Sequence, residues 1–268
     1  DGLVLECKIF GSLVIRNVTI QNGTNGGLFV THSSSNNMGN PGTVLILKSI
    51  FKNNSTETNG GGITIGAVSH TGKSANIWLI DNIISNNIAR QGAGAFFTIR
   101  AEAVSNNWGH VVLLGNTITD NEVICGDGGG VHIRYTSDRD PAGRILLKGN
   151  TISSNSAYGE GSGCTGIGGG IFIFSRSSAE REYPSSLNMI TLEENNIINN
   201  LSQRSGGGVY VFSEADDGRA AAIKIDKNII SNNTAIDSGG IDVTSISSDL
   251  GRSGDIYFNQ NFISRNTS

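Results

Sequence analysis

The sequence is poor in the residues that mark several protein classes. Only 3 of 268 residues are Pro, aromatic residues make up 6%, and charged residues make up 16%, against about 25% in an average domain. No apolar run approaches the roughly 18 residues of a membrane-spanning helix. The net charge of −4 comes without a Lys/Arg cluster, which argues against nucleic acid as a partner. Regularly spaced apolar residues and this low net charge argue against disorder.

Gly is abundant instead, with 37 residues, and much of it recurs in one motif. A Gly-rich cluster leads seven times into alternating apolar residues. The clusters begin at Gly26, Gly60, Gly92, Gly128, Gly168, Gly206 and Gly239. Spacings of roughly 30 to 40 residues are typical of one supersecondary unit repeated along the chain. So much Gly with few good helix formers argues against a helical fold.

A second motif, Asn-x-Ile-x-x-Asn, precedes most Gly clusters. Its copies begin at Asn82, Asn116, Asn150, Asn195, Asn228 and Asn261, with a looser copy at Ser49 and a degraded one at Asn17. Short apolar strands stand before most copies, at 44–47, 77–80, 111–114, 145–147, 190–192, 223–225 and 256–258. Each repeat therefore holds three short strands, whereas a propeller blade needs four strands and hairpin turns. The pattern predicts a parallel β-helix of about eight coils that forms one all-β domain over residues 1–268.

One Asn of each copy is expected at the same turn of every coil. There its side chain can hydrogen-bond to its copies above and below and pair buried backbone groups. The predicted ladder consists of Asn54, Asn87, Asn121, Asn155, Asn200, Asn233 and Asn266.

The pairing of Gly-Gly-Gly-Ile/Val with Phe/Ile-x-x-Asn resembles the repeats of right-handed β-helix surface proteins. The pattern is similar to that of the chlamydial polymorphic outer-membrane proteins, with their Gly-Gly-Ala-Ile and Phe-x-x-Asn tetrapeptides. Phe51-Lys52-Asn53-Asn54 keeps the second tetrapeptide, and the other copies replace Phe with Ile. The resemblance implies a right-handed β-helix and an extracellular or cell-surface location. The membrane barrel of that family has no counterpart here.

Polar segments follow the Gly-led strands and are expected along one edge of the rod. They span 31–42, 66–75, 100–109, 134–143, 175–187, 212–221 and 244–254. Insertions on one face often form the binding face of a solenoid; solvated connections are the alternative. Trp108 and Tyr183 are the only strong aromatic candidates there for glycan binding.

Signs of catalysis are weak. The motifs of pectin hydrolases are incomplete, because Asn116-Thr117-Ile118 and Gly109-His110-Val111 each lack a residue of the pattern. Asp127, Glu160 and Asp237 lie in related turns rather than on rigid strand positions. Arg134 with Asp138 and Asp140 is the nearest approach to a metal or sugar site, with a solvated ion-paired loop as the alternative.

No cofactor is expected. The spacing of the four histidines does not match a metal site; they are His32, His70, His110 and His132. All four are predicted at the surface, with the His132 side chain pointing outward. The sequence does not decide whether the chain is an enzyme, and it favours a non-catalytic role.

Two kinds of covalent modification are predicted. Cys125 and Cys164 lie at comparable turns of consecutive coils and are candidates for a disulfide, which implies an oxidising compartment. Cys7 is left over, either buried or able to pair with another chain. Among the Asn-x-Ser/Thr sequences, Asn17, Asn53 and Asn232 are glycosylation candidates, because several others fall at the inward ladder position.

The two ends of the chain fit the register of the repeat. The chain begins at Asp1 without a preceding signal-like segment, so we expect a processed chain or a fragment. The last residues followed by the first continue the repeat, and no cap is recognisable. Either a longer solenoid has been cut, or subunits stack end to end into a filament. The sequence favours a structural or adhesive surface protein that self-associates, with a polysaccharide-processing enzyme or a glycan-binding module as alternatives.

Overall fold

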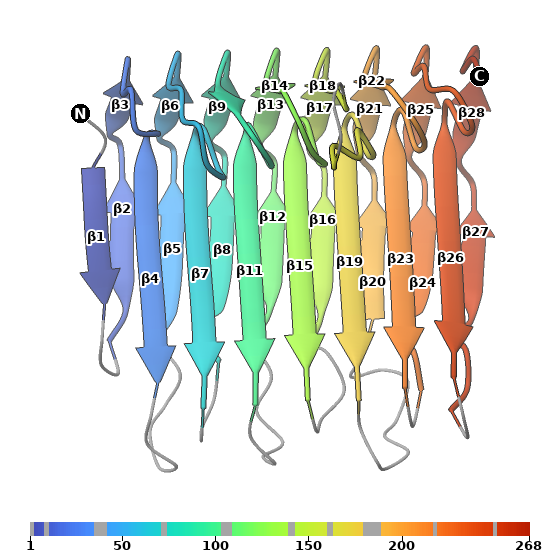
Figure 1. Cartoon of the computed structure of the whole chain (residues 1–268), viewed down its shortest axis with the longest axis horizontal. Helices are drawn as coiled ribbons and strands as arrows, with labels where there is room; N and C mark the ends of the chain where they lie inside the picture. Colours follow the sequence, from blue (N-terminus) through green and yellow to red (C-terminus); the bar gives the residue numbers. More distant parts are fainter. Residues whose placement is uncertain are drawn as a thin grey trace.

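The structure, a computed structural model, describes residues 3–7, 11–34, 42–70, 74–102, 109–138, 143–159, 163–178, 189–216, 219–248 and 251–268. Within these ranges every regular element is a β-strand. The strands lie side by side from the N-terminal to the C-terminal end of an elongated stack (Figure 1). All strand pairings between named strands are parallel, because successive coils follow the same path. The prediction of an all-β parallel β-helix is confirmed.

The first sheet contains the longest strands and lies at the front of Figure 1. We count one coil from each of its strands to the next, so the eight strands enclose slightly fewer complete coils than the predicted eight. Its eight strands are β1 (Leu3–Cys7), β4 (Leu28–Ser34), β7 (Ile63–Ser69), β11 (Ala95–Ala101), β15 (Val131–Ser137), β19 (Ile171–Ser177), β23 (Val209–Ala215) and β26 (Ile241–Ser247). These strands extend several residues beyond the Gly-led runs, into segments that the sequence pattern assigned to polar loops.

The second sheet lies behind the first and also has eight strands. They are β2 (Leu13–Arg16), β5 (Thr43–Leu47), β8 (Asn76–Ile80), β12 (Val111–Leu114), β16 (Ile145–Lys148), β20 (Met189–Glu193), β24 (Ala222–Asp226) and β27 (Ile256–Asn259). The apolar runs predicted before each Asn motif form these strands.

The third sheet carries the middle of each Asn motif. Its eight strands are β3 (Thr19–Gln21), β6 (Ile50–Lys52), β9 (Ile83–Ser85), β13 (Thr117–Thr119), β17 (Thr151–Ser153), β21 (Asn196–Ile198), β25 (Ile229–Ser231) and β28 (Phe262–Ser264). A fourth sheet of two-residue strands follows in the middle coils only. It consists of β10 (Ile88–Ala89), β14 (Glu122–Val123), β18 (Ser156–Ala157) and β22 (Leu201–Ser202), so the expected three strands per repeat become four there.

Inward side chains form continuous apolar columns through the stack. On the first sheet Ile133 is in register with Phe97 on one side and Ile173 on the other, and all three are fully buried. Such columns arise because identical positions stack about 4.8 Å apart. Each fully buried Ile or Val stabilises the fold by roughly 1.5–3 kcal/mol relative to an exposed one.

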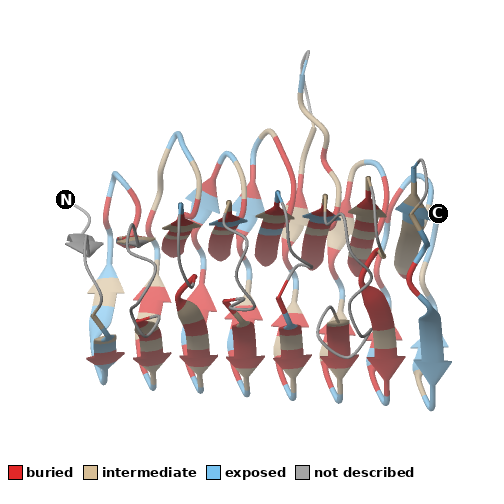
Figure 2. Cartoon of the chain, turned by 90° about the horizontal axis from the view of Figure 1, so that it is seen from below, coloured by how far each residue is buried: buried red, intermediate tan, exposed pale blue. Residues whose placement is uncertain are grey.

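The burial pattern changes at the C-terminal coil. Figure 2 shows buried strands through the middle of the stack and exposed strands beside the C-terminus. Ile256, Phe258 and Ile263 occupy inward positions, in register with buried residues of the preceding coil, yet they are 41%, 51% and 49% exposed. Core-type side chains therefore face solvent at this end of the stack.

The Gly motif and the Asn motif contact each other. A Cβ atom at Gly130 would lie 2.7 Å from the Gly170 carbonyl oxygen of the next coil and 3.0 Å from Nδ2 of the ladder residue Asn155. Gly128 has φ +72°, which residues with a Cβ rarely adopt. Gly is thus required both for the turn and for close stacking of the coils.

Candidate functional site

From the second coil onward, Asn side chains connect each coil to the next at the turn after the third sheet. The Asn87 side-chain amide donates to Oδ1 of Asn121 at 2.9 Å and to the carbonyl of Phe51 at 3.0 Å. Its Oδ1 accepts from the backbone and side-chain nitrogens of Asn54. The same contacts recur along the predicted set, whose members are Asn54, Asn87, Asn121, Asn155, Asn200, Asn233 and Asn266. We call this the second Asn ladder.

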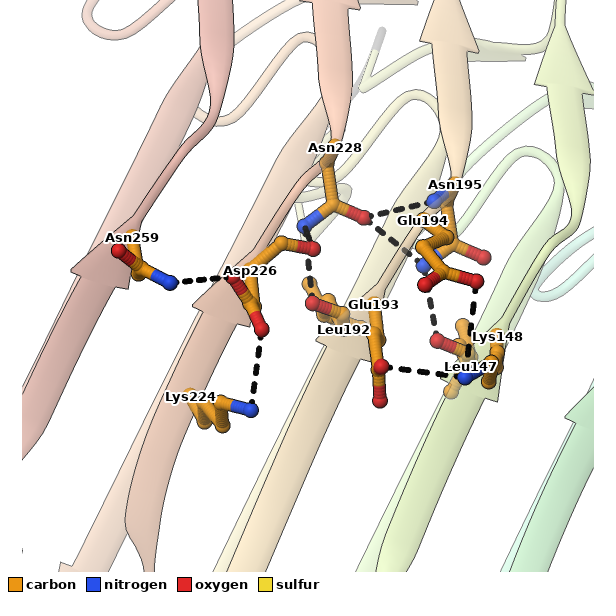
Figure 3. Close-up of polar contacts among 10 residues, drawn as sticks. All are labelled: Leu147, Lys148, Leu192, Glu193, Glu194, Asn195, Lys224, Asp226, Asn228 and Asn259. Atoms are coloured by element: carbon orange, nitrogen blue, oxygen red, sulfur yellow. Dashed lines mark hydrogen bonds and ion pairs between the residues drawn. The ribbon is translucent and has the colours of Figure 1, made fainter.

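A parallel ladder lies at the turn between the second and third sheets, and the sequence analysis did not predict it. We call it the first Asn ladder; its members are Asn82, Asn116, Asn150, Asn195, Asn228 and Asn261. Figure 3 shows part of it: Asn195 donates to Asn228 and to the Leu147 carbonyl. Beside it, Lys148 pairs with Glu193 at 3.1 Å. The signal was present, because this Asn is the first residue of each Asn motif copy.

The first coil lacks both ladders, and here the predicted register was off by one residue. In the second coil Asn54 begins the second ladder, while Ser49 stands at the first-ladder position. Asn17 and Asn22 occupy the exposed turn position with φ 55° and 60° rather than the ladder. Val18 and Gly23 stand at the ladder positions, where their backbone nitrogens donate to Ser49 Oγ and Asn54 Oδ1. The glycosylation candidates Asn17, Asn53 and Asn232 all lie at exposed turn positions of this kind, so their side chains are accessible.

The structure joins Cys125 and Cys164 in a disulfide, with the Cα atoms 4.8 Å apart. It links the turn after β14 to the turn after β18, on consecutive coils. Cys7 ends β1, which pairs with β4.

A groove of about 820 Å³ lies on the outward face of the first sheet, over β11, β15 and β19. Its lining falls into three rows that cross the strands. The first row, just before the Gly clusters, has amide and carboxyl side chains and consists of Asn59, Gln91 and Asp127. The second row has aromatic and imidazole rings and consists of Phe96, His132 and Phe172. The third row has guanidinium and hydroxyl groups and consists of Thr98, Arg100, Arg134, Thr136 and Arg176.

The aromatic row is a continuous stack across four coils. The His132 ring lies 4.7 Å from the Phe96 ring and 4.6 Å from the Phe172 ring, centroid to centroid. Phe172 in turn stacks on Tyr210 at 5.4 Å. Rings at such separations pack favourably, and because they cover one another Phe96, His132 and Phe172 are buried although they point away from the core.

His132 points away from the core, as predicted, but it is only 4% exposed. Its Nδ1 donates to the carbonyl of Asp127 at 3.2 Å. Burial lowers the pKa of His132 to about 4, with the hydrogen bond opposing the shift and Arg134 adding to it. His32 is also buried. The prediction that all four histidines lie at the surface is therefore wrong for these two, because rings on adjacent coils or the core itself cover them.

Arg134 differs from the other two arginines of the groove in its contacts with the described residues. Its guanidinium lies 5.4 Å from the centre of the Phe174 ring, and among the described residues no carboxylate is within ion-pair distance of it. Its neighbours differ: Arg100 pairs with Glu102 at 3.0 Å, and Arg176 pairs with Asp216 at 2.8 Å. Arg100 and Arg176 lie two residues further along the neighbouring strands than Arg134, in register with Thr136. Among the described residues, an anionic group entering the groove would therefore meet the Arg134 guanidinium without a competing carboxylate.

The Asp127 carboxyl lies at the other edge of the groove and is 8% exposed. Its Oδ1 accepts from the Ile167 backbone nitrogen at 3.0 Å. Burial raises the pKa of Asp127, while hydrogen bonds from Thr165 and Ile167 and the charge of Arg204 act against that shift. A buried carboxyl group at a groove edge is a hydrogen-bond acceptor for a ligand.

Those remaining candidate residues that the structure describes do not assemble a second site. Asp138 lies 3.7 Å from Arg100 rather than beside Arg134, and Asp237 is exposed. Glu160, Asp140, Trp108 and Tyr183 lie outside the described residues. In the part of the chain that the structure describes, no group of three His, Cys, Asp or Glu residues could hold a metal ion. No helix of that part is long and apolar enough to cross a membrane.

The path of the chain and its repeats identify the family. A family model described as "Right handed beta helix region" matches residues 5–181. The chain belongs to the right-handed β-helix family. No curated protein and no solved structure matches the chain. The right-handed β-helix is thus confirmed, whereas the narrower resemblance to chlamydial surface proteins is not. In this β-helix the same three sheets continue past residue 181 to β28.

Proposed function

We propose that this β-helix binds an extended, negatively charged polysaccharide along the outward face of the first sheet, as an adhesive protein outside the cell or on its surface. The observation that carries the proposal is the exposed Arg134 guanidinium in the groove, which has no carboxylate partner among the described residues. Arg134 is in register with Thr98 and Phe174 on the neighbouring strands. Charge-assisted hydrogen bonds from a guanidinium suit carboxylate and sulfate groups.

The three rows of the groove match the chemistry of an acidic sugar. The aromatic row offers a surface for the less polar face of a ring, and the amide and carboxyl row offers partners for hydroxyl groups. The rows cross the strands, so a chain-like ligand would run along the axis of the stack. The Cys125–Cys164 disulfide fits a protein of an oxidising compartment, which supports the extracellular location.

Affinity measurements with polygalacturonate, dextran sulfate and neutral dextran test the proposal. We expect binding of the two acidic polymers, and Arg134→Gln should weaken it by about tenfold because one charge-assisted contact contributes roughly 1.5–3 kcal/mol. Arg144→Gln removes the same charge at an exposed position outside the groove and should change the affinity less than twofold.

Equal effects of the two substitutions, or no binding of any polymer, would overturn the proposal. Release of new chain ends from a bound polymer would instead favour the polysaccharide-processing alternative.

End-to-end association is a second candidate function, favoured by the exposed core-type residues of the C-terminal coil. Ile241, Val243, Phe258 and Ile263 line a hollow of about 420 Å³ there. The opposite end carries Val18 and Gly23 at the ladder positions, so a second copy stacked head to tail would not continue either Asn ladder. Electron microscopy and the mass in solution test this candidate: fibres support it, and a monomer of 28.1 kDa contradicts it.

A further inference from the structure

The turn after β18 carries an insertion that borders the groove. Residues 158–170 connect β18 to β19, whereas residues 124–130 connect β14 to β15 and residues 203–208 connect β22 to β23. The longer connection belongs to the coil in the middle of the groove. The extra residues are not needed to close a coil, because the shorter connections of the neighbouring coils close theirs without such an insertion.

The insertion is fixed to both neighbouring coils. On one side the disulfide joins Cys164 to Cys125, and the Gly166 nitrogen donates to the Gly126 carbonyl at 3.1 Å. On the other side Ser202 Oγ donates to the Gly166 carbonyl at 2.7 Å. Its described residues are thus anchored to three successive coils.

This anchored insertion holds the Asp127 carboxyl group. Ile167 and Thr165, the two residues that hydrogen-bond to the carboxyl group, lie within three residues of Cys164. The carbonyl of Asp127 also accepts from the His132 ring in the aromatic row. The position of one groove-lining carboxyl therefore depends on the loop that the disulfide fixes.

We propose that Asp127 is a specificity-determining residue that accepts hydrogen bonds from ligand hydroxyl groups, and that the Cys125–Cys164 disulfide is its positioning device. The inference rests on the proposed binding of a polysaccharide in the groove. Asp127 shares its row with Asn59 and Gln91, and Arg134 lies beyond the rings. A sugar bound across these rows has hydroxyl groups against the Asp127 row and its acidic group against Arg134.

The test compares polygalacturonate with its O-acetylated form, in which the hydroxyl groups can no longer donate. The unmodified protein should bind the acetylated polymer about tenfold more weakly. In Asp127→Ala, and equally in the double variant Cys125→Ser/Cys164→Ser, this ratio should fall to about one. Combining the three substitutions should change the ratio no further, since the disulfide acts through Asp127.

Asp120→Asn is the matched control, because Asp120 is an exposed carboxylate in the turn after β13; it should leave the ratio unchanged. Asp127→Asn keeps an oxygen that can accept from Ile167 and replaces the Ala variant if that variant does not fold. Reduction of the Cys125–Cys164 disulfide in the unmodified protein should lower the binding ratio in the same way as the double Ser variant.

The possible failures are distinguishable. If no acidic polymer binds, both the proposed function and this inference are wrong. If binding depends on Arg134 but Asp127→Ala keeps the tenfold ratio, only the role of Asp127 is overturned. If the disulfide variant keeps the ratio while Asp127→Ala loses it, the positioning role of the disulfide is overturned.

Discussion

The two faces of the first sheet follow different rules. Inward positions repeat from coil to coil, as in Ile65, Phe97, Ile133, Ile173 and Val211, which are all fully buried. Outward positions one residue away change at every coil, from Thr64 to Phe96, His132, Phe172 and Tyr210. Stacking requires the first set to be similar, but it places no such demand on the second. The repeated inward residues thus determine the fold, whereas the unrepeated outward residues line the groove that we propose as a binding site.

The largest expected effect concerns the repeated residues. Asn87→Ala removes one member of the second Asn ladder and leaves buried groups of Asn54 and Phe51 without partners. Because an unpaired buried polar group costs about 1–3 kcal/mol, we expect a loss of about 3–5 kcal/mol of unfolding free energy. Urea denaturation measures it.

The preceding residue provides the control. Asn86 is exposed and has φ 53°, a conformation that Gly adopts readily, so Asn86→Gly should change the unfolding free energy by no more than about 0.5 kcal/mol. Equal losses in the two variants would show that the ladder contributes nothing beyond the turn.

A smaller effect concerns an unrepeated residue, His132. The pKa of His132 is about 4 in the folded protein, whereas an exposed histidine has a pKa of 6.5. Between pH 4 and pH 6.5 the unfolded chain therefore binds more protons than the folded one. The unfolding free energy should therefore fall as the pH falls from 6.5 to 4, by up to about 3 kcal/mol from this residue. Burial lowers the pKa of His32 and His110 as well, and both act in the same direction.

His132→Phe isolates the contribution of this ring, since Phe can stack between Phe96 and Phe172 without titrating. Urea denaturation at several pH values should show a shallower pH dependence for this variant. An unchanged dependence would mean that the buried ring is not the source of the acid sensitivity.

The fold was predictable because it depends on repeated positions. The Gly clusters, the apolar runs of the second sheet and the second Asn ladder all recur at a recognisable spacing. The first Asn ladder was equally visible in Asn82 and its copies, but only one Asn per copy was assigned to a ladder. At the N-terminal end the exposed Asn17 and Asn22 obscured the true register, in which Val18 and Gly23 are the equivalent residues.

The groove was not predictable in the same way. Phe96, His132 and Phe172 each stand four residues after the start of a Gly cluster, so their register could be read from the motif. The motif did not show that these outward rings cover one another, and the expectation that outward residues are exposed failed for His132. The disulfide was foreseeable, since Cys125 and Cys164 precede equivalent Gly clusters. The role of Asp127 depends on the insertion after β18, which no repeat predicts.

The most direct test of the account is an experimental structure of the chain with an acidic oligosaccharide. We predict that the ligand lies across β11, β15 and β19, with its carboxylate or sulfate group against Arg134 and its ring over the Phe96–His132–Phe172 row. A ligand bound elsewhere on the rod, or an empty groove at concentrations that saturate binding, would contradict the central claim.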